Sequence, residues 1–358
     1  MNVKIKWLRD TLGAGNMQGM IVSNPINIKY LTGIEAEGTL LITRRENIYI
    51  TDGRFTELAK EKITIDDEII VCDVKDLVKD DYEHFFTYCE NVGFEENYVT
   101  YAQYQRILQL YQCNNLVETA GIIEKHRIIK EEEEIENIKT ACSITDKCFD
   151  HLIKFIKKGM TEIEIASEIE NFFIKNGAEG VSFKPIVASG PNSSKPHAIP
   201  TKRKIESGDV ITIDMGCKIN GYCSDMTRTI FVDYVREDVK QIYDIVLNNQ
   251  KLVLREIRDG RTVKDIAKIS ECDYELNNFT LIHALGHGIG LEEHEYPFLS
   301  TKSNMILKEN TVVAVEPGIY ICGKFGVRIE DTVLILKNHC INLTNSEKNY
   351  IIIGNKTP

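Results

Sequence analysis

The stretch "VITIDMGCKINGYCSDMT", residues 210–227, has the pattern of a β-hairpin whose two strands meet at the Asn-Gly pair 220–221. Asn-Gly is the strongest short signal for a two-residue type I′ turn. That turn fixes the pairing of the strands and places Asp214 opposite Thr227. Because side chains alternate between the faces of a strand, Asp214 and Asp225 lie diagonally on one face, with backbones about 7–8 Å apart. The hairpin therefore predicts two carboxylates within reach of one shared object.

A second part of the chain repeats this pattern. "VVAVEPG" (312–318) resembles "VITIDMG" in the positions of acid and glycine, and "GVRIEDT" (326–332) resembles "GYCSDMT" in those of glycine, acid and threonine. The acids of this second copy are Glu316 and Glu330. They share a face if the loop near "CGKFG" has an odd number of residues, and its two glycines permit three or five. Arg328 would then lie on the same face, two residues before Glu330.

Four carboxylates on facing strand surfaces repel one another unless something separates them. They could instead point to solvent or pair with basic residues. Against this alternative, Asp214 and Glu316 stand within apolar β-runs, where an unpaired charge is costly. A pair of divalent cations would neutralise all four acids, so the pattern predicts a metal site.

The segment "LIHALGHGIGLEEHEYP", residues 281–297, offers a nitrogen ligand for such a site. His287 lies between two glycines, which let the backbone approach a crowded centre and leave the imidazole unshielded. His283 and His294 stand nearby in the same segment. The spacing is not His-Glu-x-x-His, so this is no zincin helix. The glycines also lack the G-x-G-x-x-G spacing of a dinucleotide-binding loop.

Composition places the chain among globular proteins with room for two domains. Its 358 residues carry a net charge of −11, from 43 basic and 54 acidic residues, which argues against nucleic acid or an anionic membrane as the main partner. There is no apolar run of about 18 residues, so no membrane span is expected. The first residues lack the apolar core of a signal peptide, and we expect a cytoplasmic protein. The ten cysteines include no C-x-x-C pair and are expected to be reduced thiols.

The character of the chain changes near residue 125. Residues 1–124 alternate helical patterns with short strand-like runs, which predicts an α/β domain. Residues 125–358 begin with two amphipathic helices, the second opened by a capping box at Thr161, and continue in strands and hairpins. A helical stretch at about 236–270 interrupts these strands. We interpret the acidic run Glu131–Glu134 as the solvated first turn of the first helix.

These motifs together resemble the pita-bread metallopeptidases and, within that family, the proline peptidases: Xaa-Pro dipeptidase (prolidase) and aminopeptidase P. The resemblance is carried by "PHAIPTKRKIESGDVITIDMGCKINGYCSDMTRT", "HALGHGIGLEEHEYP" and "VEPGIYICGKFGVRIEDT". "NIKYLTG" and "YITDGRF" are similar to the creatinase-type N-terminal domain. The resemblance implies an α+β chain with a C-terminal pita-bread (creatinase/aminopeptidase) fold. Its N-terminal α/β domain would be creatinase-type, or ribonuclease H-like.

The resemblance implies two divalent metal ions held by five ligands. These ligands are Asp214, Asp225, His287, Glu316 and Glu330. Asp225 and Glu330 would bridge the ions, Asp214 would bind one ion, and His287 with Glu316 would bind the other. Because four ligands are carboxylates, Mn(II) is favoured, with Co(II) or Zn(II) as alternatives. Two ions about 3.5–4 Å apart can share a water and acidify it to hydroxide near neutral pH.

Catalytic residues around the metals are implied in the same way. The hydroxide would attack the carbonyl carbon that precedes proline, with Glu316 accepting the proton of the water. His294 would stabilise the tetrahedral oxyanion, and His283 would contact the substrate. His197, in "SKPHAIP", is a third histidine for the pocket, although each of the three could be an ordinary hydrogen-bonded residue. Arg328 is either a partner of the acid cluster or a clamp on the free carboxylate of a dipeptide.

The implied activity is hydrolysis of Xaa-Pro bonds by a homodimeric metallo-exopeptidase, in the first place a dipeptidase acting on proline-containing dipeptides. Aminopeptidase P activity on longer peptides is the alternative, because the choice depends on the depth of the cleft beyond the scissile bond. Methionine aminopeptidase has the same ligand types but no such N-terminal domain. Creatinase is metal-independent, whereas all five ligand positions are filled here. A binding protein that has lost catalysis would be expected to lack one or more ligands.

Overall fold

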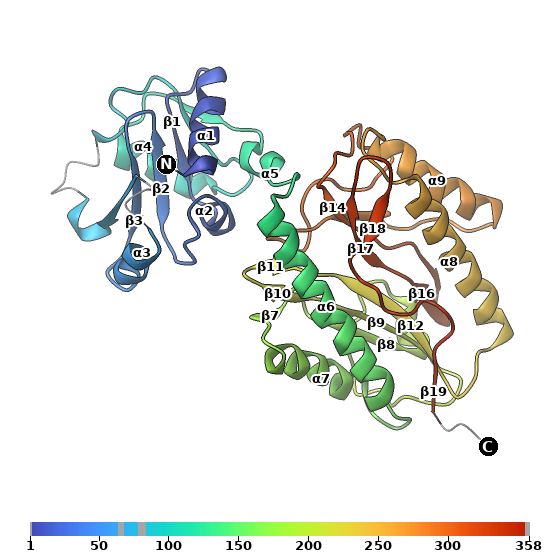
Figure 1. The fold of residues 1–358 in the computed structure, drawn as a ribbon. Coiled ribbons are helices and arrows are strands. Elements are labelled where there is room, and N and C mark those ends of the chain that lie inside the picture. Colours follow the sequence, from blue (N-terminus) through green and yellow to red (C-terminus); the bar gives the residue numbers. More distant parts are fainter. Residues whose placement is uncertain (1, 64–67, 78–83, 355–358) are drawn as a thin grey trace. The chain divides into compact units, whose positions relative to one another are not determined.

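The structure is a computed structural model that describes residues 2–63, 68–77 and 84–354. The chain divides into two compact units, residues 1–126 and 127–358 (Figure 1). All ten cysteines carry free thiols, as the sequence predicts. Among the described residues, no helix combines the length and the apolar character that a membrane crossing requires.

The first unit is built on a mixed six-stranded sheet with the strand order β4-β3-β2-β1-β5-β6. β1, β2 and β3 form an antiparallel meander, and the other neighbouring strands pair in parallel. The helical segments are α1 (Val3–Ala14), α2 (Pro25–Thr32), α3 (Thr56–Lys62), the short 3-10 helix η2 (Val74–Asp76), α4 (Tyr101–Tyr111) and α5 (Ile122–His126). The strands are β1 (Gly19–Val22), β2 (Thr39–Thr43), β3 (Asn47–Thr51), β4 (Ile69–Asp73), β5 (Val92–Phe94) and β6 (Leu116–Glu118).

Local sequence signals account for the elements of this unit. β1 reads Gly-Met-Ile-Val and is buried on both faces, as a central strand between two helical layers should be. α2 starts where the Asn24 side chain caps the amide of Ile26, with Pro25 in the first turn. It ends at Gly33, whose φ of 74° lies in the left-handed region. The unit is an α/β domain, as the sequence predicts.

The second unit holds the candidate site and consists of small sheets covered by long helices. Its sheets have the orders β19-β12-β9-β8, β13-β14-β17-β18, β11-β10-β7 and β15-β16. The helical segments are α6 (Glu132–Phe155), α7 (Glu162–Lys175), the 3-10 helix η4 (Gly190–Ser194), α8 (Glu237–Glu256) and α9 (Val263–Leu276). The strands are β7 (Gly180–Val181), β8 (Ile186–Ser189), β9 (Val210–Met215), β10 (Cys217–Ile219), β11 (Tyr222–Cys223), β12 (Met226–Val232), β13 (Gly286–Gly288), β14 (Val312–Val315), β15 (Gly318–Ile321), β16 (Phe325–Arg328), β17 (Asp331–Ile335), β18 (Cys340–Asn342) and β19 (Ile352–Ile353).

The helices pack in two pairs, each against one of the four-stranded sheets (Figure 1). α6 and α7 share a buried apolar core with β8, β9 and β12. α8 and α9 share another with β14 and β17. Each pair buries an amphipathic stripe against a sheet, which is the usual way in which such layers become stable. The two hairpins with their acids line one cavity of this unit.

The helices of the second unit confirm one prediction and correct two. The capping box at Thr161 opens α7 as predicted. The acidic run at the start of α6 is not wholly solvated, because Glu134 is buried and accepts a hydrogen bond from the Tyr222 hydroxyl at 2.7 Å. The predicted helical stretch at 236–270 is two helices, α8 and α9. Gly260, with a φ of 81°, lies in the turn that separates them.

The Asn-Gly turn sets the register of the first hairpin as the sequence predicts. The two residues at 220–221 have φ values of 49° and 80°, both positive as a type I′ turn requires. The same register continues into β9 and β12 and pairs Asp214 with Thr227. A Cβ atom on Gly216 would lie 1.9 Å from the carbonyl oxygen of Ser224, so only glycine fits opposite the second acid.

The second hairpin closes with a loop of odd length. β15 and β16 pair across residues 322–324, so the loop has three residues. β14 and β17 continue the same register. Glu316 and Glu330 fall at facing positions in this register, on the same side as Arg328.

Candidate metal centre

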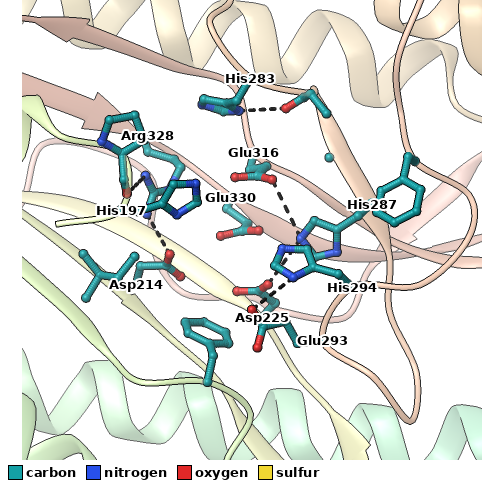
Figure 2. A pocket seen from close by; sticks show the side chains of 16 residues that line it. His197, Asp214, Asp225, His283, His287, Glu293, His294, Glu316, Arg328 and Glu330 are labelled. Carbon is teal, nitrogen blue, oxygen red and sulfur yellow. Dashed lines mark hydrogen bonds and ion pairs between the residues drawn. The ribbon is translucent and has the colours of Figure 1, made fainter. Parts of the chain in front are cut away.

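One cavity of the second unit gathers the residues that the sequence selects (Figure 2). All nine line its wall: His197, Asp214, Asp225, His283, His287, His294, Glu316, Arg328 and Glu330. The apolar side chains of Phe183, Ile186 and Phe298 form another part of the wall. The cavity therefore joins a cluster of acids and imidazoles to an apolar surface.

The tightest cluster of possible ligand atoms belongs to Asp225, His287 and Glu330. One ligand atom from each lies within 4.8 Å of the other two. The Nε2 atom of His287 is 3.6 Å from Asp225 Oδ2 and 3.7 Å from Glu316 Oε1. These separations are too long for direct hydrogen bonds, and they leave space between the donors.

Buried carboxylate oxygens without partners show that a cation fits this cavity. Within the part of the chain that the structure describes, Asp214 Oδ1 and Asp225 Oδ1 are buried and accept no hydrogen bond. An unsatisfied buried carboxylate oxygen is costly unless a cation neutralises it. The donor set is four carboxylates and one imidazole, which suits hard divalent ions such as Mn(II). The residues present therefore fit the metal ions that the resemblance implies.

The electrostatics of the cavity also favour a cation. Burial, and then repulsion by neighbouring carboxylates, raises the pKa of Asp225 and of Glu330 well above their ordinary values. Burial raises the pKa of Glu316 to about 7. Burial also lowers the pKa of His287 to about 3, so its imidazole is neutral and able to act as a ligand. The cavity therefore holds acids that resist ionisation without a counter-ion, beside a ready nitrogen donor.

Two glycines let the His287 strand fit between its neighbours. A Cβ atom on Gly286 would lie 1.9 Å from the carbonyl oxygen of Ala314, on β14. A Cβ atom on Gly288 would lie 2.1 Å from the carbonyl oxygen of Tyr296. The glycines on either side of His287 are thus required by close backbone contacts on both sides, which places the imidazole at the acids.

Threonine side chains tie the two hairpins together beneath the acids. Thr227 Oγ1 donates to Glu330 Oε2 at 2.6 Å, and the amide of Glu330 donates to the carbonyl of Thr227 at 3.1 Å. Thr332 Oγ1 donates to the carbonyl of Asp225 at 2.7 Å. Each threonine follows an acid by two residues in its own hairpin and contacts the acid residue of the other hairpin. The repeated acid-x-threonine pattern thus has a structural reason.

Arg328 lies deep in the wall, and each of its three guanidinium nitrogens donates a hydrogen bond. Nη2 donates to Asp214 Oδ2 at 2.6 Å, and Nε donates to Thr227 Oγ1 at 3.0 Å. Nη1 donates to the Tyr320 hydroxyl at 2.7 Å and to the carbonyl of Pro196 at 3.1 Å. These contacts suit a partner of the acid cluster, and a guanidinium with this many partners is poorly placed to clamp a substrate carboxylate.

Tyr320 is a member of the site that the sequence patterns did not select. Its hydroxyl lies 3.3 Å from His283 Nε2 and so connects that imidazole to Arg328. Burial raises the pKa of Tyr320 to about 12, so the hydroxyl keeps its proton. Burial also lowers the pKa of His283 to about 4. The available signal was its place on β15, two residues beyond Gly318 on the face that carries Arg328.

Glu293 is a second such member. It lines the cavity, and its Oε1 atom lies 3.1 Å from His294 Nδ1. The hydrogen bond with Glu293 raises the pKa of His294. The next residue, Glu295, is buried and accepts hydrogen bonds from Arg127 at 2.5 Å and from Lys130 at 2.7 Å. The ion cluster at Glu295 therefore fixes the loop that carries His294, and Glu293 sets the pKa of its imidazole.

Comparisons with known proteins match both units of the chain. Residues 136–337 match the model of metallopeptidase family M24, and residues 4–129 match that of the creatinase/prolidase N-terminal domain. An uncharacterized peptidase of Bacillus subtilis is 37% identical over 98% of this chain and 100% of its own, and an Xaa-Pro dipeptidase of Pyrococcus horikoshii is 34% identical over 98% and 99%. Among solved structures, an Xaa-Pro dipeptidase from Bacillus anthracis superimposes with a TM-score of 0.93 at 34% identity, covering 98% of this chain and 99% of that one. An X-Pro aminopeptidase from Thermotoga maritima gives 0.89 at 31% identity, with the same coverage.

Proposed function

This chain belongs to metallopeptidase family M24, and from that membership we propose that it is a dimetal Xaa-Pro dipeptidase. The observation that carries the proposal is the cluster of Asp225, His287 and Glu330, with ligand atoms within 4.8 Å of one another beside buried carboxylate oxygens that lack partners. The relatives named Xaa-Pro dipeptidase support the substrate class, because they match almost the whole chain.

The metal-holding residues in this proposal are the five that the family resemblance implies. They are Asp214, Asp225, His287, Glu316 and Glu330. Divalent ions bound by these residues supply Lewis acidity, which polarises a substrate carbonyl and lowers the pKa of water. Mn(II) is the proposed ion, because a set of four carboxylates and one imidazole is rich in oxygen. Co(II) and Zn(II) are the alternatives to compare with it.

The other side chains hold protons and orient the substrate. Glu316, whose carboxylate lines the cavity 3.7 Å from His287 Nε2, is the proposed acceptor of a proton from water. His294 is half exposed at the cavity and, with a proton held by Glu293, can donate to a developing oxyanion. His283 and His197 face the substrate space, and Arg328 fixes Asp214.

The assay that tests this function follows the release of proline. The metal-free protein is incubated with Mn(II) and Ala-Pro, and free proline is measured. We expect turnover with Mn(II) and less than one hundredth of it in Asp225→Asn. No proline from Ala-Pro and no cleavage of a longer Xaa-Pro peptide with Mn(II), Co(II) or Zn(II), from a protein shown by titration to bind the ion, would leave only a non-catalytic binding protein of this fold.

An Xaa-Pro aminopeptidase is the second candidate, because the Thermotoga maritima structure of that title superimposes over 98% of this chain. Ala-Pro and a longer peptide of the form Xaa-Pro-Pro-Yaa distinguish the two. Higher kcat/KM for the dipeptide supports the dipeptidase, and the reverse supports the aminopeptidase. The proposal includes a homodimer in the cytoplasm, which light scattering and cell fractionation would test.

A further inference from the structure

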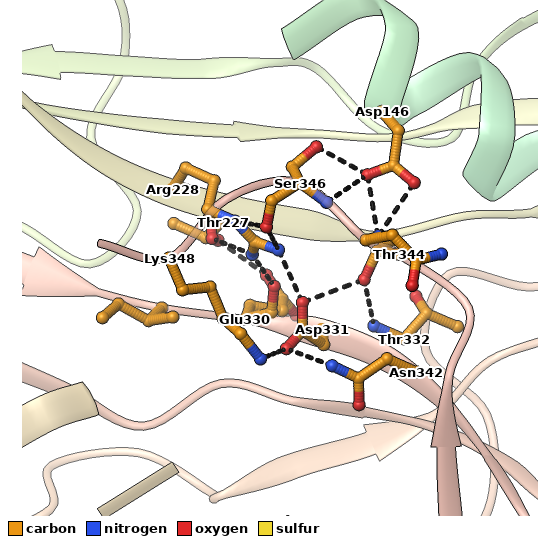
Figure 3. A network of polar contacts seen from close by, with 12 residues as sticks. Asp146, Thr227, Arg228, Glu330, Asp331, Thr332, Asn342, Thr344, Ser346 and Lys348 are labelled. Atoms are coloured by element: carbon orange, nitrogen blue, oxygen red, sulfur yellow. Dashed lines mark hydrogen bonds and ion pairs between the residues drawn. The ribbon is translucent and has the colours of Figure 1, made fainter. Parts of the chain in front are cut away.

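A buried ion pair lies directly behind the proposed metal ligand Glu330 (Figure 3). Arg228 follows Thr227 on β12, and Asp331 follows Glu330 at the start of β17. Their side chains are 2% and 0% exposed, and Arg228 Nη2 lies 2.6 Å from Asp331 Oδ1. Because successive side chains of a strand point to opposite faces, this pair lies on the reverse side of the same two segments that carry Thr227 and Glu330.

The guanidinium of Arg228 holds the backbone on both sides of the acid contact. Nη1 donates to the carbonyl of Thr227 at 2.9 Å and to the carbonyl of Glu330 at 2.5 Å. Nε and Nη2 donate to the carbonyl of Ser346 at 3.2 and 2.9 Å. One planar cation thus ties the backbone of Glu330 to that of Thr227, whose hydroxyl donates to the Glu330 carboxylate.

The Asp331 carboxylate has five donors around it. Oδ1 accepts from Arg228 and from Thr344 Oγ1 at 3.1 Å, and Oδ2 accepts from Gln250, Asn342 and Lys348 at 3.0, 3.1 and 2.5 Å. Burial opposes ionisation, but Arg228 and Lys348 outweigh it and keep the pKa of Asp331 below its ordinary range. Two cationic and three neutral side chains therefore hold this one carboxylate, directly beside Glu330 in the chain.

A C-terminal strap, residues 344–348, closes this network and is anchored away from the metal centre. Asp146 on α6 accepts hydrogen bonds from the amides of Asn345 and Ser346 at 2.9 and 2.8 Å, and from Ser346 Oγ at 2.6 Å. In the strap, the carbonyl of Ser346 accepts a hydrogen bond from Arg228, and the ammonium of Lys348 donates one to Asp331. Removing Asp146 or Lys348 therefore reaches the network without touching a metal-facing side chain.

We propose that the Arg228–Asp331 pair, together with the strap 344–348, positions Glu330 for metal binding. The strap acts on this pair through the contact of Lys348 with Asp331. The inference rests on the proposed metal centre. A buried ion pair by itself adds little stability relative to apolar residues of the same size, so five donors on one carboxylate are poorly explained by stability alone. Groups that orient metal ligands from behind typically change metal affinity or activity by about 10–100-fold when mutated.

The test compares Lys348→Met and Lys348→Arg with Tyr350→Phe as the matched control. Tyr350 lies two residues beyond the strap, and its hydroxyl donates to Asp244 on α8, so Tyr350→Phe removes that hydrogen bond and keeps the packing of the ring on Tyr243. Mn(II) affinity of the metal-free proteins is measured by calorimetry, and melting temperature is measured in chelator. We expect Lys348→Met to bind Mn(II) about tenfold more weakly, with KM for Ala-Pro unchanged at saturating Mn(II). Lys348→Arg should recover most of the affinity, and Tyr350→Phe should bind as the wild type does.

Asp146→Asn is the second variant, since it loosens the strap from its far end. It should also weaken Mn(II) binding, by a smaller factor. If Lys348→Met does not fold, Asp146→Asn and Lys348→Arg together test whether the strap affects Mn(II) affinity. Wild-type Mn(II) affinity in the Lys348 and Asp146 variants, with lowered melting temperatures, would show a purely structural network and overturn the proposal. Failure of the proposed function looks different: the wild type would bind Mn(II) yet release no proline, while the affinity comparison would still stand.

Discussion

His294 Nδ1 and Glu293 Oε1 lie 3.1 Å apart at the cavity, and this hydrogen bond raises the pKa of His294. A raised pKa means that the imidazolium keeps its proton to higher pH. We predict that Glu293→Gln lowers this pKa, so that kcat/KM begins to fall at lower pH on the alkaline side. At pH 6 the variant should approach wild-type activity, because His294 is then protonated in both proteins.

The pH profile of kcat/KM for Ala-Pro measures this effect. Glu292→Gln is a matched control, because Glu292 pairs with Arg127 and does not line the cavity. If the kcat/KM profiles of Glu293→Gln and the wild type superimpose on the alkaline side, His294 does not act through its proton.

Metal binding should release protons in a pH-dependent way. Burial raises the pKa of Glu316 to about 7, so most Glu316 side chains are protonated at pH 6 and ionised at pH 8. The pKa of His287 is lowered to about 3, so this ligand contributes no proton. We predict that Mn(II) binding releases more protons at pH 6 than at pH 8, and that its affinity increases with pH.

Calorimetry in two buffers of different ionisation enthalpy counts these protons. Glu316→Gln should release about one proton fewer than the wild type at pH 6 and nearly the same number at pH 8. A proton count that is constant from pH 6 to pH 8 would contradict the assignment of Glu316 to the metal centre.

Breaking the ion cluster at Glu295 should destabilise the protein strongly, because removing one partner leaves buried cations without their carboxylate. Glu295→Gln leaves Arg127 and Lys130 buried beside a neutral group, and we expect a loss of about 3–5 kcal/mol in the free energy of unfolding at pH 7. Burial opposes its charge, but Lys130 and Arg127 lower the pKa of Glu295 below its ordinary value of 4.5. The stabilisation is therefore present above pH 4.5 and is lost as the pH falls through the lowered pKa. Urea unfolding at several pH values measures the difference in unfolding free energy between Glu295→Gln and the wild type, which should narrow on acidification. A difference that stays constant with pH would contradict this prediction.

The glycine before His287 should tolerate no side chain. Gly286→Ala places a Cβ atom 1.9 Å from a backbone oxygen of β14, and we expect a loss of about 1–3 kcal/mol or more, together with weaker Mn(II) binding. Gly180→Ala is the control, because a Cβ atom there meets nothing within 4 Å. Thermal unfolding and Mn(II) titration measure both effects. Equal melting temperatures for the two variants would mean that β13 can move aside.

The sequence predicts those parts of this molecule that follow from local periodicity. The Asn-Gly turn alone fixes the pairing of Asp214 with Thr227, because the side-chain period of a strand is two. Asp214 and Glu316 stand in apolar runs, where a carboxylate is conspicuous. The repeat then points to the second hairpin, although its loop length was left open between three and five residues.

Contacts that depend on one distant side chain were not predictable in this way. Glu134 belongs to an acidic run typical of a solvated helix start. It is nevertheless buried and accepts a hydrogen bond from Tyr222, which lies 88 residues away in the chain. The Arg228–Asp331 pair joins residues 103 positions apart and repeats in no pattern. Tyr320 and Glu293 were within reach of the sequence patterns, because Tyr320 shares the strand face of Arg328 and Glu293 directly precedes His294, but only the structure shows the contacts that bring them into the site.

The three-residue loop at 322–324 has a practical consequence for protein engineering. A single residue inserted within β16 would turn Arg328 and the acid that follows it away from the cavity, whereas extra residues at the loop tip leave the alternation of both strands intact. The exposed tip is therefore a suitable attachment point for a fluorescent reporter or an affinity tag on this hairpin.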